Sequence, residues 1–86
     1  MWPNPLNPSG RLHFYTTRAG AVRVKVFDLG GRLVREVLDE ASAAPGEHEA
    51  VIDGRDGFGR PLATGVYFYR IETPEGLTSG RFTILK

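Results

Sequence analysis

A chain of 86 residues has room for a single domain and at this size buries only about 60% of the surface that its unfolded form exposes. Its 11 basic and 10 acidic residues are mixed along the chain, which argues against nucleic acid or an anionic membrane as a partner. The chain has no cysteine, so disulfides and thiolate metal sites are excluded. It also has no apolar run near the roughly 18 residues of a membrane span and no visible secretory leader, so we expect no membrane insertion.

The chain begins with a proline-rich lead-in, MWPNPLNPS. Each proline holds φ near about −65° and lacks a backbone N–H, which rules out a helix or a central strand. The residues before the prolines are restricted to extended backbone as well. We therefore predict a stiff lead-in or edge segment over residues 1–9, followed by one domain over residues 10–86.

From residue 10 onward, apolar residues recur at every second position, which is the period of a half-buried strand. A first strand is predicted around Leu12 and Phe14. A second follows at 22–27, where three valines face one side. A Gly-Gly pair at positions 30 and 31 predicts a tight hairpin turn.

The run 33–38 after this turn is predicted to be the return strand, because six residues are too few for an independent helix. Residues 39–46 are polar and small and predict a loop. A short strand over 47–52, a glycine-rich loop over 53–61 and a strand over 65–72 follow. Because both faces of that last strand are apolar or aromatic, we expect it to be central and covered on both sides.

A turn at Pro74–Gly76 leads into a terminal strand that ends at Lys86. The whole pattern predicts an all-β, immunoglobulin-like Greek-key β-sandwich of about seven short strands, with no helix.

Candidate chemical groups are few. His13 and His48 fall on alternating strands, and too few further ligands are available for a zinc site. Asp53 and Asp56 lie in the glycine-rich loop, where they either bind calcium or, as we prefer, accept hydrogen bonds from local backbone N–H groups. No serine lies in a nucleophile motif and no glycine-rich phosphate loop is present. We therefore predict no enzyme activity, no cofactor and no metal.

Three aromatic residues allow two interpretations. Phe58, Tyr67 and Tyr69 could line a carbohydrate-binding face, because flat rings with a polar tip stack on sugars. The preferred interpretation is that such residues form the sandwich core with their hydroxyl groups at its rim. A carbohydrate partner is therefore only a weak alternative.

Several segments occur in a characteristic order: PNPLNPS, VKVFDLGGRLVREVLDE, PGEHEAVIDGRDGFGRPLATGVYFYRI and a terminal ILK. Together they cover almost the whole chain. They resemble the immunoglobulin-like domain family found in flagellar hook-capping proteins and, more often, as the C-terminal sorting domain of proteins exported by the type IX secretion system. One departure is Ile52, where the family usually has tryptophan.

The resemblance implies a non-catalytic recognition domain of an exported bacterial protein, located outside the cell or at its surface. Its partners would be the secretion machinery or other protein subunits. A structural assembly domain, like that of hook-capping proteins, is the alternative. Carried over by position, the candidate sorting signal is Arg81, Phe82, Thr83, Ile84, Leu85 and Lys86. The residues that match the family's loop pattern, with an architectural role, are Asp53, Gly54, Asp56, Gly59 and Gly65.

Overall fold

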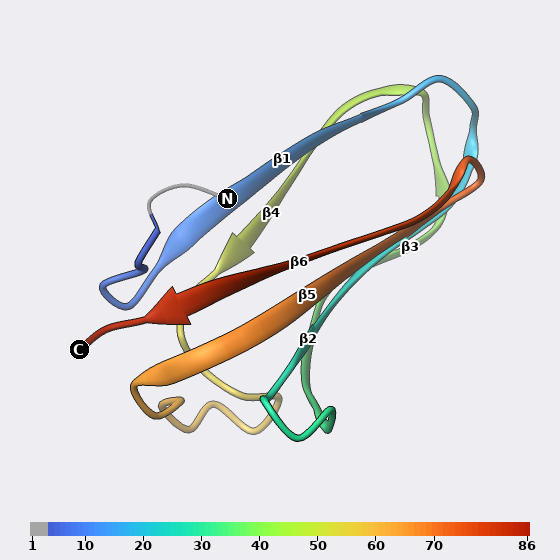
Figure 1. The fold of residues 1–86 in the computed structure, drawn as a ribbon. Coiled ribbons are helices and arrows are strands. Elements are labelled where there is room, and N and C mark those ends of the chain that lie inside the picture. Colours follow the sequence, from blue (N-terminus) through green and yellow to red (C-terminus); the bar gives the residue numbers. More distant parts are fainter. Residues whose placement is uncertain (1–3) are drawn as a thin grey trace.

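Two antiparallel sheets form the part of the protein that the computed structural model describes, residues 4–86 (Figure 1). The smaller sheet pairs β1 with β4, and the larger has the strand order β3-β2-β5-β6. The strands are β1 (Gly10–Thr16), β2 (Gly20–Phe27), β3 (Leu33–Ala43), β4 (Gly46–Ile52), β5 (Gly65–Thr73) and β6 (Gly76–Ile84). Within residues 4–86 there is no helix with the length and apolar character to cross a membrane.

The predicted all-β sandwich is confirmed, with six strands in place of about seven. The lead-in adds a single bridge, in which Leu6 pairs in parallel with Ile84. Both Asn–Pro bonds of the lead-in, Asn4–Pro5 and Asn7–Pro8, are cis. The first three residues of the predicted lead-in lie outside the described residues.

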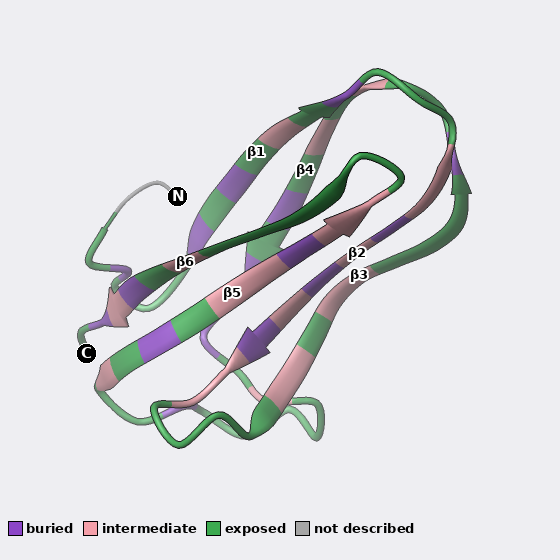
Figure 2. Cartoon of the chain, turned by 45° about the vertical axis from the view of Figure 1, so that its right-hand side comes forward, coloured by how far each residue is buried: buried purple, intermediate pink, exposed green. Residues whose placement is uncertain are grey.

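The core lies between the two sheets, and its residues alternate with exposed ones along the strands (Figure 2). The three valines of β2 are at most 1% exposed, as their spacing predicted. Val24 and Val26 belong to two adjoining apolar clusters, and the cluster that contains Val26 also includes Leu6 from the lead-in. The buried apolar side chains are Leu6, Leu12, Val22, Val24, Val26, Ala43, Ala50, Ile52, Leu62, Tyr67, Ile71, Phe82 and Ile84.

The loop predicted over residues 39–46 is wrong in its first half. Residues 39–43 continue β3, because β2 runs opposite them and pairs Gly20 with Ala43 and Arg23 with Asp39. Residues 39–42 are exposed, so backbone pairing and not apolar burial extends the strand. Only the two residues between β3 and β4 remain as a connection.

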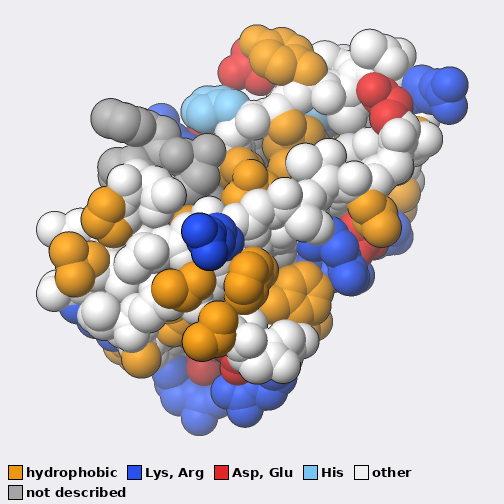
Figure 3. Space-filling view, viewed as in Figure 1, with side chains coloured by type: hydrophobic (Ala, Val, Ile, Leu, Met, Phe, Trp, Pro, Cys, Tyr) orange, Lys and Arg blue, Asp and Glu red, His pale blue; other side chains and the backbone are white. Residues whose placement is uncertain are grey.

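The prediction that the strand over 65–72 is covered on both sides is also wrong. This strand, β5, is central in its sheet, and Tyr67 and Ile71 on its inner face are buried. On its outer face Val66 is 38% exposed and Phe68 is 36% exposed, and no described element packs over them. Figure 3 shows hydrophobic side chains gathered on this face along the lower part of β5. Apolar residues on both faces of a strand therefore do not require two covered faces.

Candidate functional site

One end of the sandwich collects both the lead-in and the end of the last strand. Because neighbouring strands are antiparallel, β1 and β5 begin at this end, while β4 and β6 finish there (Figure 1). The turn between β2 and β3, residues 28–32, and the loop between β4 and β5, residues 53–64, also lie here. Lysine and arginine side chains gather at the lower edge of this end (Figure 3).

The lead-in is hydrogen-bonded along the edge of β6. The Leu6 N–H donates to the Thr83 carbonyl at 2.8 Å, and the Leu85 N–H donates to the Leu6 carbonyl at 2.8 Å. The Thr83 N–H donates to the Asn4 Oδ1 at 3.1 Å. The Lys86 N–H donates to the Thr64 hydroxyl at 3.2 Å, which ties the end of the chain to the loop. This edge of the sheet is therefore partly covered by the chain's own lead-in.

The candidate sorting residues divide into two groups. Phe82 and Ile84 are core residues, 1% and 0% exposed. Thr83 is half-buried, whereas Arg81, Leu85 and Lys86 are exposed. A deletion of the whole segment would therefore remove core packing together with any recognition surface.

The loop residues form a network of local hydrogen bonds. Asp53 Oδ1 accepts from the Arg55 N–H at 3.0 Å and from Arg35 Nη1 at 2.7 Å. The Gly54 carbonyl accepts from the Leu62 N–H at 2.8 Å. Gly54 has φ +76°, and a Cβ built on it would lie 2.8 Å from the Pro8 Cβ, so the lead-in passes directly over this glycine. Gly65 begins β5 opposite Ile84.

Asp56 accepts the hydrogen bonds that hold the turn over residues 56–60 of this loop. Its Oδ1 accepts from the N–H groups of Phe58 and Arg60, both at 2.9 Å, and its Oδ2 accepts from Arg60 Nε at 3.1 Å. These are protein donors of the kind expected for an Asx turn. Neither Asp53 nor Asp56 presents a carboxylate arranged toward a shared cation position, and among residues 4–86 no group of three metal-ligating side chains comes together.

The same turn occurs a second time, at residues 28–32. Asp28 Oδ1 accepts from the Arg32 N–H at 2.9 Å, and Asp28 Oδ2 lies 3.3 Å from Arg32 Nε. In each turn the aspartate N–H donates to the arginine carbonyl, and the glycine before the arginine donates to the aspartate carbonyl. Those glycines, Gly31 and Gly59, have φ of +87° and +83°. The two pentapeptides, DLGGR and DGFGR, share the pattern D-x-x-G-R, a short repeat that strand periodicity and turn residues do not reveal.

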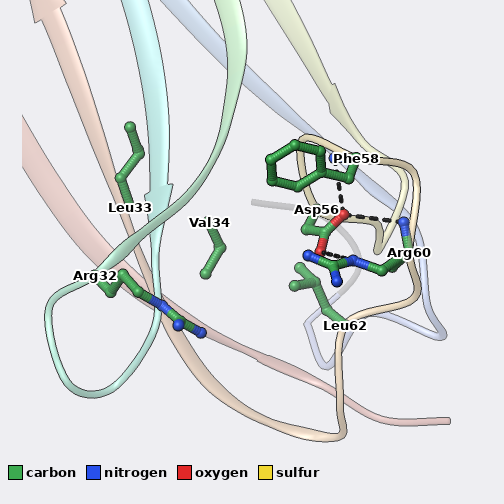
Figure 4. A pocket seen from close by; sticks show the side chains of 7 residues that line it. All are labelled: Arg32, Leu33, Val34, Asp56, Phe58, Arg60 and Leu62. Carbon is green, nitrogen blue, oxygen red and sulfur yellow. Dashed lines mark hydrogen bonds and ion pairs between the residues drawn. The ribbon is translucent and has the colours of Figure 1, made fainter.

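A hollow of about 220 Å³ lies between these two turns (Figure 4). Val34 and Leu62 form its apolar floor, and Arg32 and Arg60 line it from the two turns. Figure 4 shows the Arg32 side chain extending from its turn toward the loop, and Phe58 beside Asp56 at the loop. Arg60 also stacks on the Phe58 ring, with 5.1 Å from the guanidinium carbon to the ring centroid.

The pKa of Asp56 is lowered, mainly by the hydrogen bond from the Arg60 backbone N–H. Desolvation acts in the opposite direction, but the Phe58 N–H and the Arg60 side chain lower the pKa further. Because this pKa is lower in the folded state, the unfolded state binds more protons as the carboxyl group titrates. The ionised Asp56 therefore stabilises the folded state fully above the ordinary carboxyl pKa. This stabilisation is lost as pH falls through the lowered folded value.

We predict that Asp56→Asn lowers the melting temperature most at neutral pH, and that the difference from the parent narrows in acid. Thermal melts at pH 7 and at about pH 2.5 would measure this. Glu36→Gln is the matched control, because Glu36 is exposed and forms no ion pair with any described residue. A pH-independent difference for Asp56→Asn would contradict the prediction.

The remaining candidate residues are held in separate places. His13 lies on the outside of the smaller sheet, 3.5 Å from Glu47 and 3.6 Å from Glu49. His48 lies on the other face, 2.9 Å from the Thr16 hydroxyl and stacked on Phe14. The two histidines therefore do not form a common site.

The three aromatic residues do not form a common exposed face. Tyr67 is buried and stacks on Phe82, and its hydroxyl donates a hydrogen bond to the Ala63 carbonyl at 2.7 Å. Tyr69 is half-buried against the same phenylalanine, whereas Phe58 is 86% exposed at the loop. Burial raises the pKa of the Tyr67 hydroxyl, with a smaller effect from Asp28. The predicted core role matches this geometry for Tyr67 and Tyr69 but is wrong for Phe58, which lies exposed in the glycine-rich loop, and the three rings do not form a carbohydrate-binding face.

Two antiparallel sheets, together with a buried tyrosine whose hydroxyl bonds a carbonyl four residues upstream, place the protein in the class of immunoglobulin-like sandwich domains. The chain belongs to the FlgD Ig-like domain family, whose model matches residues 7–76. Members of this family are structural, non-enzymatic domains. Comparison with curated proteins found no match.

Similar solved structures come from two kinds of bacterial protein. FlgD from P. aeruginosa is 20% identical with a TM-score of 0.68, over 90% of this chain and 60% of that one. Latent, dimeric PorU from Porphyromonas gingivalis is 24% identical with a TM-score of 0.73, over 99% of this chain and 9% of that one. PorZ, an essential surface component of the type IX secretion system of P. gingivalis, is 25% identical with a TM-score of 0.61, over 99% of this chain and 11% of that one. The chain thus spans about 60% of the length of this FlgD and about a tenth of the lengths of PorU and PorZ.

Proposed function

We propose that this domain is a non-catalytic sorting or anchoring domain, which directs an exported bacterial protein through the type IX secretion route to the cell surface. The observation that carries the proposal is the likeness to PorZ, in which nearly the whole of this chain matches about a tenth of a much larger protein of that system. This proportion is what a small recognition module attached to a large protein requires. Its surroundings would be extracellular or at the cell surface.

The exposed part of the last segment would carry the signal. Arg81, Leu85 and Lys86 present a charged and apolar surface, while Phe82 and Ile84 anchor the strand in the core. The lead-in lies against the same strand, so the start of the domain and the candidate signal form one rigid unit. Partner recognition at this end needs no catalytic group.

The test is a reporter protein fused to the N-terminus of the domain and expressed in a host with the type IX system. We expect surface export of this fusion and at least a tenfold loss of export for the variant Arg81→Gln/Leu85→Ser/Lys86→Gln, because one lost charged contact at a recognition surface costs about 1.5–3 kcal/mol. The control Arg11→Gln/Arg18→Gln/Leu77→Ser likewise replaces two exposed basic residues and one exposed leucine, at other places on the surface, and should be exported normally.

Both triple variants keep Phe82 and Ile84, so circular dichroism should show parent-like folding in each. A folded Arg81/Leu85/Lys86 variant that is exported as well as the parent would show that the signal lies elsewhere. Retention of the unaltered fusion inside the cell would contradict the sorting function itself.

A second candidate function is a structural assembly domain like that of flagellar hook-capping proteins. The family match over residues 7–76 and the likeness to FlgD favour it. Replacing the immunoglobulin-like domain of a FlgD protein with this chain tests it directly. Restored motility would support assembly, whereas loss of motility together with export of the reporter would support sorting.

A further inference from the structure

The twin D-x-x-G-R turns place two arginines at the lining of one hollow. Each arginine is paired through Nε with the aspartate of its own turn, at 3.3 Å for Arg32 and 3.1 Å for Arg60. Within residues 4–86 the terminal Nη groups of both arginines have no hydrogen-bond acceptor. The Arg32 and Arg60 side chains are 81% and 72% exposed, so these donors are open to a ligand.

The aspartates orient both arginines. Asp28 Oδ2 lies 3.3 Å from Arg32 Nε, and Asp56 Oδ2 accepts a hydrogen bond from Arg60 Nε, so each guanidinium is paired at its Nε edge and leaves its Nη edge open. Stacking of Arg60 on Phe58 further restricts the guanidinium plane. Two oriented guanidinium groups lose little conformational freedom on binding a planar anion.

Apolar side chains line the hollow beside the arginines. Val34 and Leu62 form the floor of the hollow, and Phe58 stands at the loop with 86% of its surface exposed. A second hollow, of about 480 Å³, shares Arg32, Arg60 and Leu62 with the first and is also lined by Ala63 and Tyr67. Exposed aromatic residues beside arginines are typical anchors of protein interfaces.

We propose that this hollow binds a carboxylate next to an aliphatic side chain, presented by a segment of a partner protein. The carboxylate would accept hydrogen bonds from the Nη groups of Arg32 and Arg60, and the aliphatic group would cover Val34 and Leu62 beside Phe58. The site does not depend on the sorting function, and it lies on different residues from the candidate signal.

The local charges select a carboxylate over other ions. Two arginines and two aspartates leave the site without a net charge, so a single negative charge fits the free Nη donors. A doubly charged phosphate is opposed by both aspartates, and a cation finds no carboxylate oxygen without a donor.

The test is nuclear magnetic resonance titration of the 15N-labelled protein with N-acetyl-leucine, which combines a carboxylate with an aliphatic group. We expect a Kd on the order of 1 mM, with shifts of the Arg32 and Arg60 Nε–H signals and of the Phe58 and Gly59 amides. N-acetyl-leucinamide, which lacks the charge, should bind about tenfold more weakly. Inorganic phosphate should produce smaller shifts than N-acetyl-leucine at equal concentration.

Variants separate the two parts of the site. Arg32→Gln and Arg60→Gln should each weaken the binding of N-acetyl-leucine about tenfold. The control Arg18→Gln, at the opposite end of the sandwich, should leave binding unchanged. Phe58→Ser keeps both D-x-x-G-R patterns but removes the ring on which Arg60 stacks, so it tests the apolar part together with the orientation of Arg60 and should also weaken binding. Equal shifts with the amide, larger shifts with phosphate, or no shift up to about 20 mM N-acetyl-leucine would each overturn the proposal.

Discussion

Replacing Leu6 with alanine is expected to lower the free energy of unfolding by about 2–5 kcal/mol, a large share of the roughly 5–10 kcal/mol that holds such a small domain together. Leu6 is 0% exposed and packs in the cluster that contains Ile52, Phe82 and Ile84. Backbone hydrogen bonds on both its N–H and its carbonyl hold it against β6, so the surroundings cannot easily collapse into the cavity that alanine leaves.

Urea unfolding followed by circular dichroism would measure this effect, with Leu85→Ala as the matched control. The Leu85 N–H donates to the Leu6 carbonyl, but the residue is 49% exposed. Its replacement should therefore lower the free energy of unfolding by less than about 1 kcal/mol. A Leu6→Ala variant as stable as Leu85→Ala would mean that the lead-in is not part of the folded core.

The position of Leu6 changes the view of the lead-in. The prolines on either side of it predict a stiff, non-helical segment, and the sequence alone cannot distinguish a linker from an edge of the sandwich. The structure places a lead-in side chain in the core and its backbone along β6. Any partner strand that pairs with the end of β6 around Ile84 must first displace the lead-in.

The parts of the fold that could be predicted depend on local pattern. The alternation of three valines in β2 and the Gly-Gly turn after it each act within a few residues, so they identify a strand and a hairpin reliably. The end of β3 could not be found in this way, because residues 39–42 are polar and exposed and are held by pairing with β2.

The candidate site was harder to predict because it depends on contacts between distant segments. Asp56 was identified as a turn residue from its glycine-rich surroundings, and its hydrogen bonds agree. Arg32 and Arg60 were not identified, since each looks like an ordinary surface arginine until the two turns meet across one hollow. The repeated D-x-x-G-R pattern was the available signal.

Replacing Gly54 with alanine is expected to destabilise the domain by about 2–5 kcal/mol, from two causes. Gly54 has φ +76°, and placing a residue with a Cβ in the left-handed region costs about 1–2 kcal/mol. The new Cβ would also lie 2.8 Å from the Pro8 Cβ and 3.0 Å from the Pro8 carbonyl oxygen. Relieving that overlap requires the lead-in or the loop to move, at about 1–3 kcal/mol.

Gly59→Ala separates the two causes. Gly59 has a similar φ of +83°, but a Cβ there meets nothing within 4 Å, so this variant should show only the conformational cost of about 1–2 kcal/mol. The difference between the two variants in urea unfolding then measures the contact between the loop and the lead-in. Equal losses for Gly54→Ala and Gly59→Ala would show that the lead-in moves away freely. A larger loss for Gly54→Ala would show that the loop and the lead-in are packed firmly against each other, so that a partner binding at this end would meet a preformed surface.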